Sequence, residues 1–312
     1  MKIEHFLKSP KQKTVIIIAG PTAVGKTSAA ILLAKYFQTE IISADSRQCF
    51  KELNIGVSRP SIEELKEIPH HFIASNSINE NINAAFFEQY ALQKTNDLFK
   101  KNDIVIMVGG TGLYIKAFCE GLDIIPSIDE SIRKKIIQNY ELHGLAWLQN
   151  EVKKKDPKFY KVGEIQNPQR LMRALEVIES TGQSILEFRK NKKAKRDFKI
   201  IKIGLELPKE ELHANINLRV DKMINDGLVE EVRLLKGYSH VNALQTVGYS
   251  EVFEHLDGKI SLATAIEEIK KNTRQYAKRQ MTWFKKDKEI NWVNVKQASN
   301  IATVAQKLVD QL

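Results

Sequence analysis

The stretch VIIIAGPTAVGKT, residues 15–27, decides the fold class. Residues 15–19 form a β-branched apolar run with the length of a buried strand, and a helical pattern begins at Lys26. Between them, residues 20–27 match the phosphate-binding motif GxxxxGK(S/T) in full, in the strand-to-helix context that the motif requires. The sequence therefore predicts an α/β fold that binds a diphosphate or a longer phosphate chain on this loop.

Every residue of the loop is expected at the phosphates. Glycines allow the backbone to curl so that successive N–H groups and the helix N-terminus face the anion. Lys26 would place a positive charge at the terminal phosphates, and the Thr27 hydroxyl would ligate Mg²⁺. The predicted diphosphate-binding residues are Gly20, Pro21, Thr22, Ala23, Val24, Gly25, Lys26 and Thr27.

The rest of the chain alternates short apolar runs with helical patterns, which is typical of a parallel sheet with helices on its faces. From residue 129 to about residue 195 no strand-like run appears, and helical segments are separated at His143-Gly144 and Thr181-Gly182. We predict an α/β, P-loop NTPase-like parallel sheet core, residues 1–121 and 197–312, with an inserted helical domain at 122–196. The later predicted strands are 40–44, 104–108, 200–205 and 290–295, and the longest predicted helix is 261–285.

Composition and charge bound the class of protein. The chain has 312 residues, 43% hydrophobic and 28% charged, as in an ordinary globular enzyme. Lysine and arginine exceed aspartate and glutamate by 48 to 38, a net charge of +10. Residues 122–196 hold 16 basic and 10 acidic residues, and so carry +6 of that excess. A polyanionic partner for the insertion is compatible with this distribution.

Several features argue against other classes of protein. Cys49 and Cys119 stand alone, without the spacing of a disulfide framework or a zinc site. No apolar run approaches the roughly 18 residues of a membrane span. The polar, basic N-terminus lacks the apolar stretch of a signal peptide. We expect a cytoplasmic monomer with no membrane association.

The loop alone does not make the chain an ATPase. In P-loop NTPases an acid at the end of a buried strand usually helps to hold magnesium. The strand at residues 104–108 ends instead in Gly109-Gly110-Thr111-Gly112, a second tight turn without a carboxylate. The strand at 40–44 does end in an acid, Asp45. The phosphate chain need not be that of ATP, and Asp45 is free for other work.

An ordered set of motifs extends this pattern along the chain. After the phosphate loop come DSRQ at residues 45–48, PHH at 69–71 and GGTGLY at 109–114, followed by NPQRL at 167–171, RALE at 173–176, GLVEEV at 227–232, VGY at 247–249, TRQYAKRQ at 273–280 and TWF at 282–284. With these motifs the chain resembles the tRNA dimethylallyltransferases (tRNA isopentenyltransferases) of the bacterial type without a zinc finger. It departs from that family's pattern at residues 49–50, 56–60 and 75–85.

The resemblance implies a reaction and a set of partners. The family transfers a dimethylallyl group from dimethylallyl diphosphate, with Mg²⁺, to the exocyclic amine of the adenosine 3′ to the anticodon. Its P-loop holds the prenyl diphosphate, and its helical insertion grips the tRNA anticodon arm. The implied catalytic residues are Asp45 at the amine, and Thr27 and Arg219 at the diphosphate. The implied tRNA-contacting residues are Asp45, Ser46, Arg47, Gln48, Thr111, Arg133, Gln169, Arg170, Leu171, Met172 and Arg173.

The predicted helix 261–285 adds two candidates for tRNA contact, Arg274 and Lys278. At 100° per residue, Lys271, Arg274, Lys278 and Lys285 fall on one side, and Leu262, Ile266, Ile269, Tyr276 and Trp283 lie opposite. This basic stripe either contacts RNA phosphates or is a solvated face over a packed one.

Simpler roles exist for four other residues. Asp45 at a strand end can cap the following turn or bind magnesium through water. Arg219 can form a surface ion pair with its helical neighbours at 221 and 222. His70 and His71 lack the spacing of a metal site, which favours a structural or base-pocket role.

Three rival functions remain open at this stage. A transferase acting on free adenine nucleotides would not need the basic insertion. A P-loop kinase or ATPase would need the missing acid on the strand at 104–108. An RNA-binding protein without catalysis would not need Lys26, Thr27 and Asp45 together.

Overall fold

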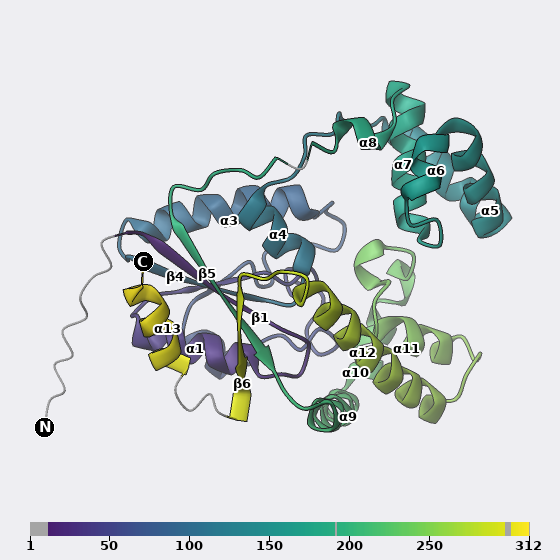
Figure 1. Ribbon diagram of the computed structural model, residues 1–312. Coiled ribbons are helices and arrows are strands. Elements are labelled where there is room, and N and C mark those ends of the chain that lie inside the picture. Colours follow the sequence, from purple (N-terminus) through teal and green to yellow (C-terminus); the bar gives the residue numbers. More distant parts are fainter. Residues whose placement is uncertain (1–11, 191, 297–300, 312) are drawn as a thin grey trace, which may run out of the picture. The chain divides into compact units, whose positions relative to one another are not determined.

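Six parallel strands form the sheet of the computed structural model, which describes residues 12–190, 192–296 and 301–311. The strand order is β3-β2-β4-β1-β5-β6, and every neighbouring pair is parallel (Figure 1). The predicted fold class is confirmed. Most of the polar N-terminal segment lies outside the described residues. The strands are β1 Thr14–Ala19, β2 Ile41–Ser43, β3 His70–His71, β4 Ile104–Gly109, β5 Lys199–Glu206 and β6 Ile290–Asn294.

The residues of β1 alternate between two hydrophobic layers, because successive side chains of a strand point to opposite faces. Ile16 and Ile18 pack with helices α1 and α13 on one face. Val15 and Ile17 pack with α3 and α4 on the other face (Figure 1). Burial on both faces explains why β1 is apolar throughout. The phosphate loop therefore begins at the end of a fully buried central strand.

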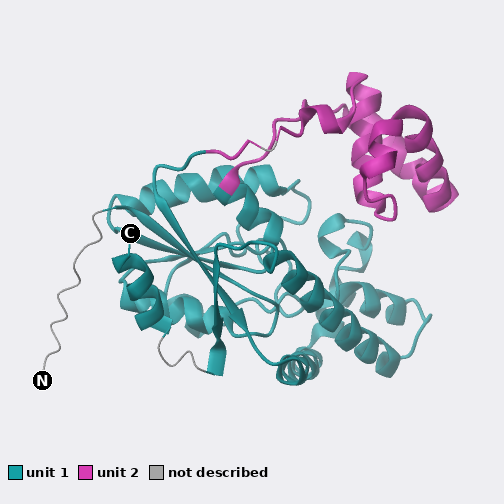
Figure 2. Ribbon diagram, in the orientation of Figure 1, with its two compact units in different colours: residues 1–119, 195–312 teal, residues 120–194 magenta. Residues whose placement is uncertain are grey.

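Backbone contacts divide the chain into two units (Figure 2). Unit 1, residues 1–119 and 195–312, contains the sheet, and unit 2 is residues 120–194. The helices that belong to the sheet unit are α1 Lys26–Tyr36, α2 Ile62–Glu67, α3 Ala84–Phe99, α4 Gly112–Glu120, α9 Lys209–Asn225, α10 Leu228–Leu234, α11 Tyr249–Leu256, α12 Leu262–Phe284 and α13 Ile301–Asp310. Two short 3₁₀ helices, Lys236–Tyr238 and Asn242–Leu244, precede α11. No helix among the described residues has the length and apolar character needed to cross a membrane.

Unit 2 consists of helices around a core of its own. They are α5 Glu130–Lys155, α6 Pro157–Val162, α7 Pro168–Thr181 and α8 Ile185–Phe188. The predicted break at residues 143–144 is present, since Gly144 leaves the helical conformation at φ 71° and ψ −168°. Asn167 caps α7 by accepting the Arg170 N–H, and Pro168 occupies a position where its missing N–H costs no hydrogen bond. Leu148, Phe159 and Leu175 are among the buried residues of this core.

Candidate active site

The phosphate loop connects β1 to α1 with an unusual backbone. Gly20 has φ 148°, and a Cβ atom there would lie 2.7 Å from the Leu205 carbonyl oxygen. Ala23 and Gly25 also have positive φ, at 63° and 92°, and Gly25 forms the N-terminal cap of α1. Glycine meets these requirements without strain at positions 20 and 25, whereas Ala23 adopts a conformation that is uncommon for a residue with a side chain. The loop thus curls around the N-terminus of α1, where the helix dipole favours an anion.

Lys26 lies against the loop from which it projects. Its Nζ donates a hydrogen bond to the Pro21 carbonyl oxygen at 2.7 Å. Desolvation lowers the pKa of Lys26 to about 7, with Asp45 raising it and Arg219 lowering it by smaller amounts. A bound diphosphate would favour the charged ammonium and raise this pKa.

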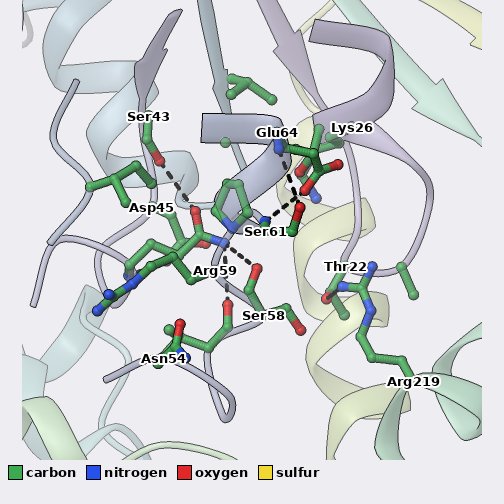
Figure 3. A pocket seen from close by; sticks show the side chains of 18 of the residues that line it. Thr22, Lys26, Ser43, Asp45, Asn54, Ser58, Arg59, Ser61, Glu64 and Arg219 are labelled. Atoms are coloured by element: carbon green, nitrogen blue, oxygen red, sulfur yellow. Dashed lines mark hydrogen bonds between the residues drawn. The ribbon is translucent and has the colours of Figure 1, made fainter. Parts of the chain in front are cut away.

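Arg219 reaches the loop from α9. Its Nη1 donates to the Thr22 hydroxyl at 3.2 Å, and the two side chains face each other in Figure 3. Desolvation lowers the pKa of the guanidinium. The surface ion pair that we considered is not what the structure shows, because Asp221 pairs with Lys270 and Lys222 pairs with Asp226. Arg219 is therefore directed at the phosphate loop.

Asp45 follows β2 and caps the turn behind it. Its Oδ1 accepts the N–H groups of Arg47 at 2.9 Å and Gln48 at 3.2 Å. Among the described residues, no hydrogen bond is formed by Oδ2. The carboxylate thus performs the simpler capping role with one oxygen and leaves the other oxygen for a ligand in the cavity that Asp45 lines.

Thr111 fixes the same turn from the end of β4. Its hydroxyl accepts the Ser46 N–H at 3.0 Å and lies 3.3 Å from the Ser46 hydroxyl. Because β2 and β4 are neighbouring parallel strands, both turns follow carboxyl ends at the same edge of the sheet. A Cβ atom at Gly109 would lie 2.2 Å from the Ala44 carbonyl oxygen, which explains the first glycine of the second turn.

Gln280 joins the two glycine-rich turns, and sequence reasoning missed it. Its Oε1 accepts the Thr22 N–H at 2.8 Å, and its Nε2 donates to the Gly110 carbonyl oxygen at 2.9 Å. A Cβ atom at Gly110 would lie 2.3 Å from that Nε2, so the turn needs glycine to receive the amide. Gln280 follows Ala277 by three residues and precedes Phe284 by four, so it lies on the same face of α12 as these two buried residues. This spacing was the sequence signal that could have indicated its burial.

A cavity of about 580 Å³ lies between these groups (Figure 3). Its walls are the phosphate loop with Lys26 and Thr27, Asp45, the segment 54–61, and parts of α9 and α12. The Gln48 side chain, predicted to contact tRNA, anchors one wall: Nε2 donates to the carbonyl oxygens of Ser58 at 2.9 Å and Val57 at 3.2 Å. In this arrangement the amide nitrogen of Gln48 is occupied by the protein itself.

The two histidines do not form a common site. His70 Nδ1 lies 2.8 Å from the Ile68 carbonyl oxygen, and His71 Nε2 lies 2.5 Å from Glu40 Oε2. Desolvation lowers the pKa of His70, which lines the cavity. Within the described residues, no group of three or more His, Cys, Asp or Glu side chains is placed to hold a metal ion.

Known proteins share this chain's sequence and fold. A family model described as IPP transferase matches residues 48–287. The chain belongs to the IPP transferase family. The tRNA dimethylallyltransferase of Christiangramia forsetii is 51% identical over 278 residues, which is 89% of this chain and 92% of that protein. The tRNA dimethylallyltransferase of Cytophaga hutchinsonii is 46% identical over 291 residues, 93% of this chain and 96% of that protein.

Solved structures give the same assignment. The full-length tRNA isopentenylpyrophosphate transferase from Bacillus halodurans has a TM-score of 0.71 at 31% identity, over 96% of this chain and 98% of that one. A eukaryotic dimethylallyltransferase described as acting on tRNA has a TM-score of 0.76 at 28% identity, over 95% and 78%. The predicted family and the predicted transferase class are confirmed.

In this IPP transferase, the predicted division of α12 into two faces is confirmed, with two residues of the packed face partly exposed. The buried face is Ala265, Ile269, Ala277, Gln280 and Phe284. Tyr276 and Trp283, expected on the packed side, are 37% and 38% exposed, and Tyr276 lines the cavity. The predicted packed face is otherwise confirmed, because Ile269 is buried, Ile266 packs against the core, and the buried residues lie on the side of the helix opposite the basic stripe.

The basic stripe of α12 is also only partly available. Lys271 pairs with Glu268 at 3.0 Å, and Lys285 pairs with Glu206 at 2.7 Å. Arg274 donates to Asn217 Oδ1 at 2.8 Å, and Lys278 is exposed. The solvated-face alternative therefore describes two of the four basic residues.

The predicted tRNA residues of unit 2 separate into surface and core. Gln169 and Arg170 are exposed, whereas Leu171 is fully buried and Met172 is 6% exposed. The side chains of Leu171 and Met172 hold α7 in the core, so they do not form a surface that contacts RNA. This outcome follows from the helical period, which turns adjacent residues of one motif to different sides.

Proposed function

We propose that this chain transfers a dimethylallyl group from dimethylallyl diphosphate to the exocyclic amine of the adenosine 3′ to the anticodon in tRNA, releasing diphosphate. One observation carries the proposal: the phosphate loop and Asp45, which has one carboxylate oxygen without a hydrogen bond among the described residues, line the same cavity. This arrangement would let a diphosphate leaving group and a proton acceptor meet in one cavity of substrate size. The acid that P-loop NTPases carry on a neighbouring strand is absent from β4, which ends in Gly109.

The loop side of the cavity stabilises the leaving group. As the allylic carbon–oxygen bond breaks, its electron pair stays on the diphosphate oxygen, and negative charge builds there. Loop N–H groups, Lys26 and Arg219 are fixed before the reaction, so they stabilise this charge without reorganising. Removing one such donor typically slows a reaction about 100–1000-fold.

Mg²⁺ suits the oxygen groups on this side. The cavity is lined by the hydroxyls of Thr22 and Thr27 and by the Asp45 carboxylate. Mg²⁺ typically takes one or two protein oxygens and completes its shell with water and substrate phosphates. We propose Thr27 as its protein ligand. When bound, the ion would neutralise charge on the diphosphate.

The opposite side of the cavity receives the adenine. The amine nitrogen forms the new bond to the allylic carbon and then loses a proton. Asp45 Oδ2 would accept the hydrogen bond of this amine, orient it and take the proton, which passes on to solvent. Positioned acid–base catalysis contributes about 100–10,000-fold. The electrostatic stabilisation of the diphosphate is expected to be at least as large.

Unit 2 supplies the proposed grip on the tRNA anticodon arm. Arg133, Gln169, Arg170 and Arg173 place polar or charged atoms at its surface. Recognition of RNA loops commonly combines phosphate contacts with hydrogen bonds to splayed bases. We further propose that the enzyme acts as a monomer in the cytoplasm.

The decisive experiment is incubation with unmodified tRNA and dimethylallyl diphosphate, followed by mass analysis of the nucleosides. We expect prenylated adenosine at the position 3′ to the anticodon. Free adenine nucleotides as acceptors test the nucleotide-specific alternative, and ATP hydrolysis tests the kinase or ATPase alternative. Prenylation of free nucleotides alone, or ATP turnover without prenyl transfer, would refute the proposal.

A further inference from the structure

A buried carboxylate in unit 2 connects two of the arginines assigned to tRNA. Glu176 lies on α7 among core residues and is 2% exposed. Its Oε2 accepts a hydrogen bond from Arg173 Nη1 on the same helix at 3.1 Å. Its Oε1 lies 3.5 Å from Arg133 Nη1, which projects from α5. Each oxygen of one carboxylate therefore serves one arginine, and the two arginines come from different helices.

The charge of this cluster does not balance. Glu176 supplies one negative charge and the two arginines supply two positive charges. The arginine side chains remain 53% and 38% exposed, so only part of each guanidinium is engaged. A carboxylate is tolerated in a core only when it is paired, and one arginine would already pair it. The second arginine leaves an excess positive charge at the surface.

We infer that Glu176 is a positioning residue that holds Arg133 and Arg173 as a paired guanidinium site for an RNA phosphate. This inference rests on the proposed function, since it requires unit 2 to bind tRNA. Guanidinium groups bind phosphate through two parallel N–H bonds in a fixed geometry. A long side chain that is ordered only on binding costs affinity. Glu176 orders both side chains before the RNA arrives.

Glu176→Gln distinguishes positioning from net charge by the sign of its effect. The substitution removes a negative charge beside a polyanion, so electrostatics alone predicts tighter tRNA binding. Positioning predicts the opposite, a rise of up to about 10-fold in the Kd for tRNA, because the amide keeps one acceptor oxygen and at least one of the two arginines then becomes ordered only on binding. Glu164→Gln is the matched control. Glu164 pairs with Arg170 at 2.8 Å, but both side chains are more than half exposed, at 55% and 53%. The control should leave the Kd unchanged or lower it.

The measurement is fluorescence anisotropy of labelled, unmodified tRNA with the full chain at several salt concentrations. A wild-type chain that does not bind tRNA would overturn both this inference and the proposed function. Wild-type binding combined with equal or tighter binding by Glu176→Gln would overturn the positioning role alone. Dimethylallyl diphosphate affinity should be the same in all variants.

A second comparison separates positioning from damage to the fold. Glu176→Gln is also made in a chain that carries Arg133→Ala and Arg173→Ala. If Glu176 acts through these arginines, its substitution causes no further loss of tRNA affinity in that background. A loss as large as in the wild-type background would assign Glu176 a purely structural role and overturn the inference.

Discussion

Diphosphate binding should be coupled to the uptake of a proton by Lys26. Desolvation, assisted by the charge of Arg219, lowers the pKa of Lys26 to about 7 despite the attraction of Asp45. The lysine amine of the free enzyme is then about half neutral at pH 7 and about nine-tenths neutral at pH 8. A bound diphosphate restores the ammonium form, because an adjacent negative charge raises the pKa of a lysine.

The size and sign of the coupling follow directly. With Lys26 fully charged in the complex, proton uptake by this lysine should be about 0.1 at pH 6, about 0.5 at pH 7 and about 0.9 at pH 8. Because the bound state holds the extra proton, diphosphate affinity falls as pH rises above 7, approaching tenfold per pH unit. In the free enzyme the same shift makes the free energy of unfolding rise with pH between about 7 and 10.5, since there the unfolded chain binds more protons.

Isothermal titration calorimetry measures this uptake. Dimethylallyl diphosphate with Mg²⁺ is titrated into the enzyme without tRNA, in two buffers of different ionisation enthalpy. Lys26→Arg is the control, because its guanidinium stays charged and reports only the protons that belong to the ligand and other groups. The wild type should exceed the control by about 0.9 proton at pH 8. Equal uptake by the two proteins at pH 8 would refute the lowered pKa of Lys26 in the free enzyme.

Three other substitutions test the remaining parts of the site. Asp45→Asn should bind both substrates near normally but transfer at least about 100-fold more slowly in a single turnover, because it cannot take the proton; a normal rate would exclude Asp45 as base and orienter. Thr27→Ala should lose Mg²⁺-dependent diphosphate affinity together with rate, and an unchanged metal dependence would remove Thr27 from the metal site. Gln280→Ala should destabilise the fold by about 2 kcal/mol, since it leaves the N–H of Thr22 and the carbonyl of Gly110 unpaired. Thermal denaturation measures that loss, and a Tm equal to the wild type would show that the bridge contributes no stability.

The sequence predicted the features whose signals are local. The phosphate loop is one continuous motif, and the strand runs and helix breaks of both units are read within windows of a few residues. The sequence also predicts that Asp45 lies at a strand end, where it can either cap the following turn or act on the substrate. The sequence could not distinguish the capping role from the proposed catalytic role, because the two roles use different oxygens of one side chain.

What could not be predicted depends on contacts between distant segments. Gln280 meets Thr22 across 258 residues, and no periodic pattern encodes that meeting. Glu176 belongs to the motif RALE at residues 173–176, but the sequence predicts no role for it, because a glutamate inside a helix pattern looks like any surface charge. Its burial depends on how α7 packs within unit 2. A motif therefore does not reveal which of its residues face outward, and the fold is needed to decide this. Leu171 and Met172 are examples, because they belong to a motif assigned to tRNA contact but are buried.

The segment 56–60, where the chain departs from its family's usual pattern, illustrates how a changed sequence keeps a cavity wall. Glu231 on α10 accepts the N–H groups of Ile55 at 2.8 Å and Gly56 at 3.1 Å. The Tyr249 hydroxyl donates to the same carboxylate at 2.5 Å. A Cβ atom at Gly56 would lie 2.5 Å from the ring of Tyr249, so this position requires glycine whatever its neighbours are.

The carbonyl groups beyond this glycine are held from the other side of the segment. Gln48 donates to Val57 and Ser58, so the wall is fixed at both ends by side chains that are absent from the segment itself. Backbone hydrogen bonds do not depend on the identity of residues 57 and 58, because every non-proline residue offers the same groups. The substitutions in this segment therefore change the chemical lining of the cavity while its backbone stays in place. Differences in base or prenyl specificity within the family are expected to arise from such side chains, and losses of activity from Gly56, Glu231 or Tyr249.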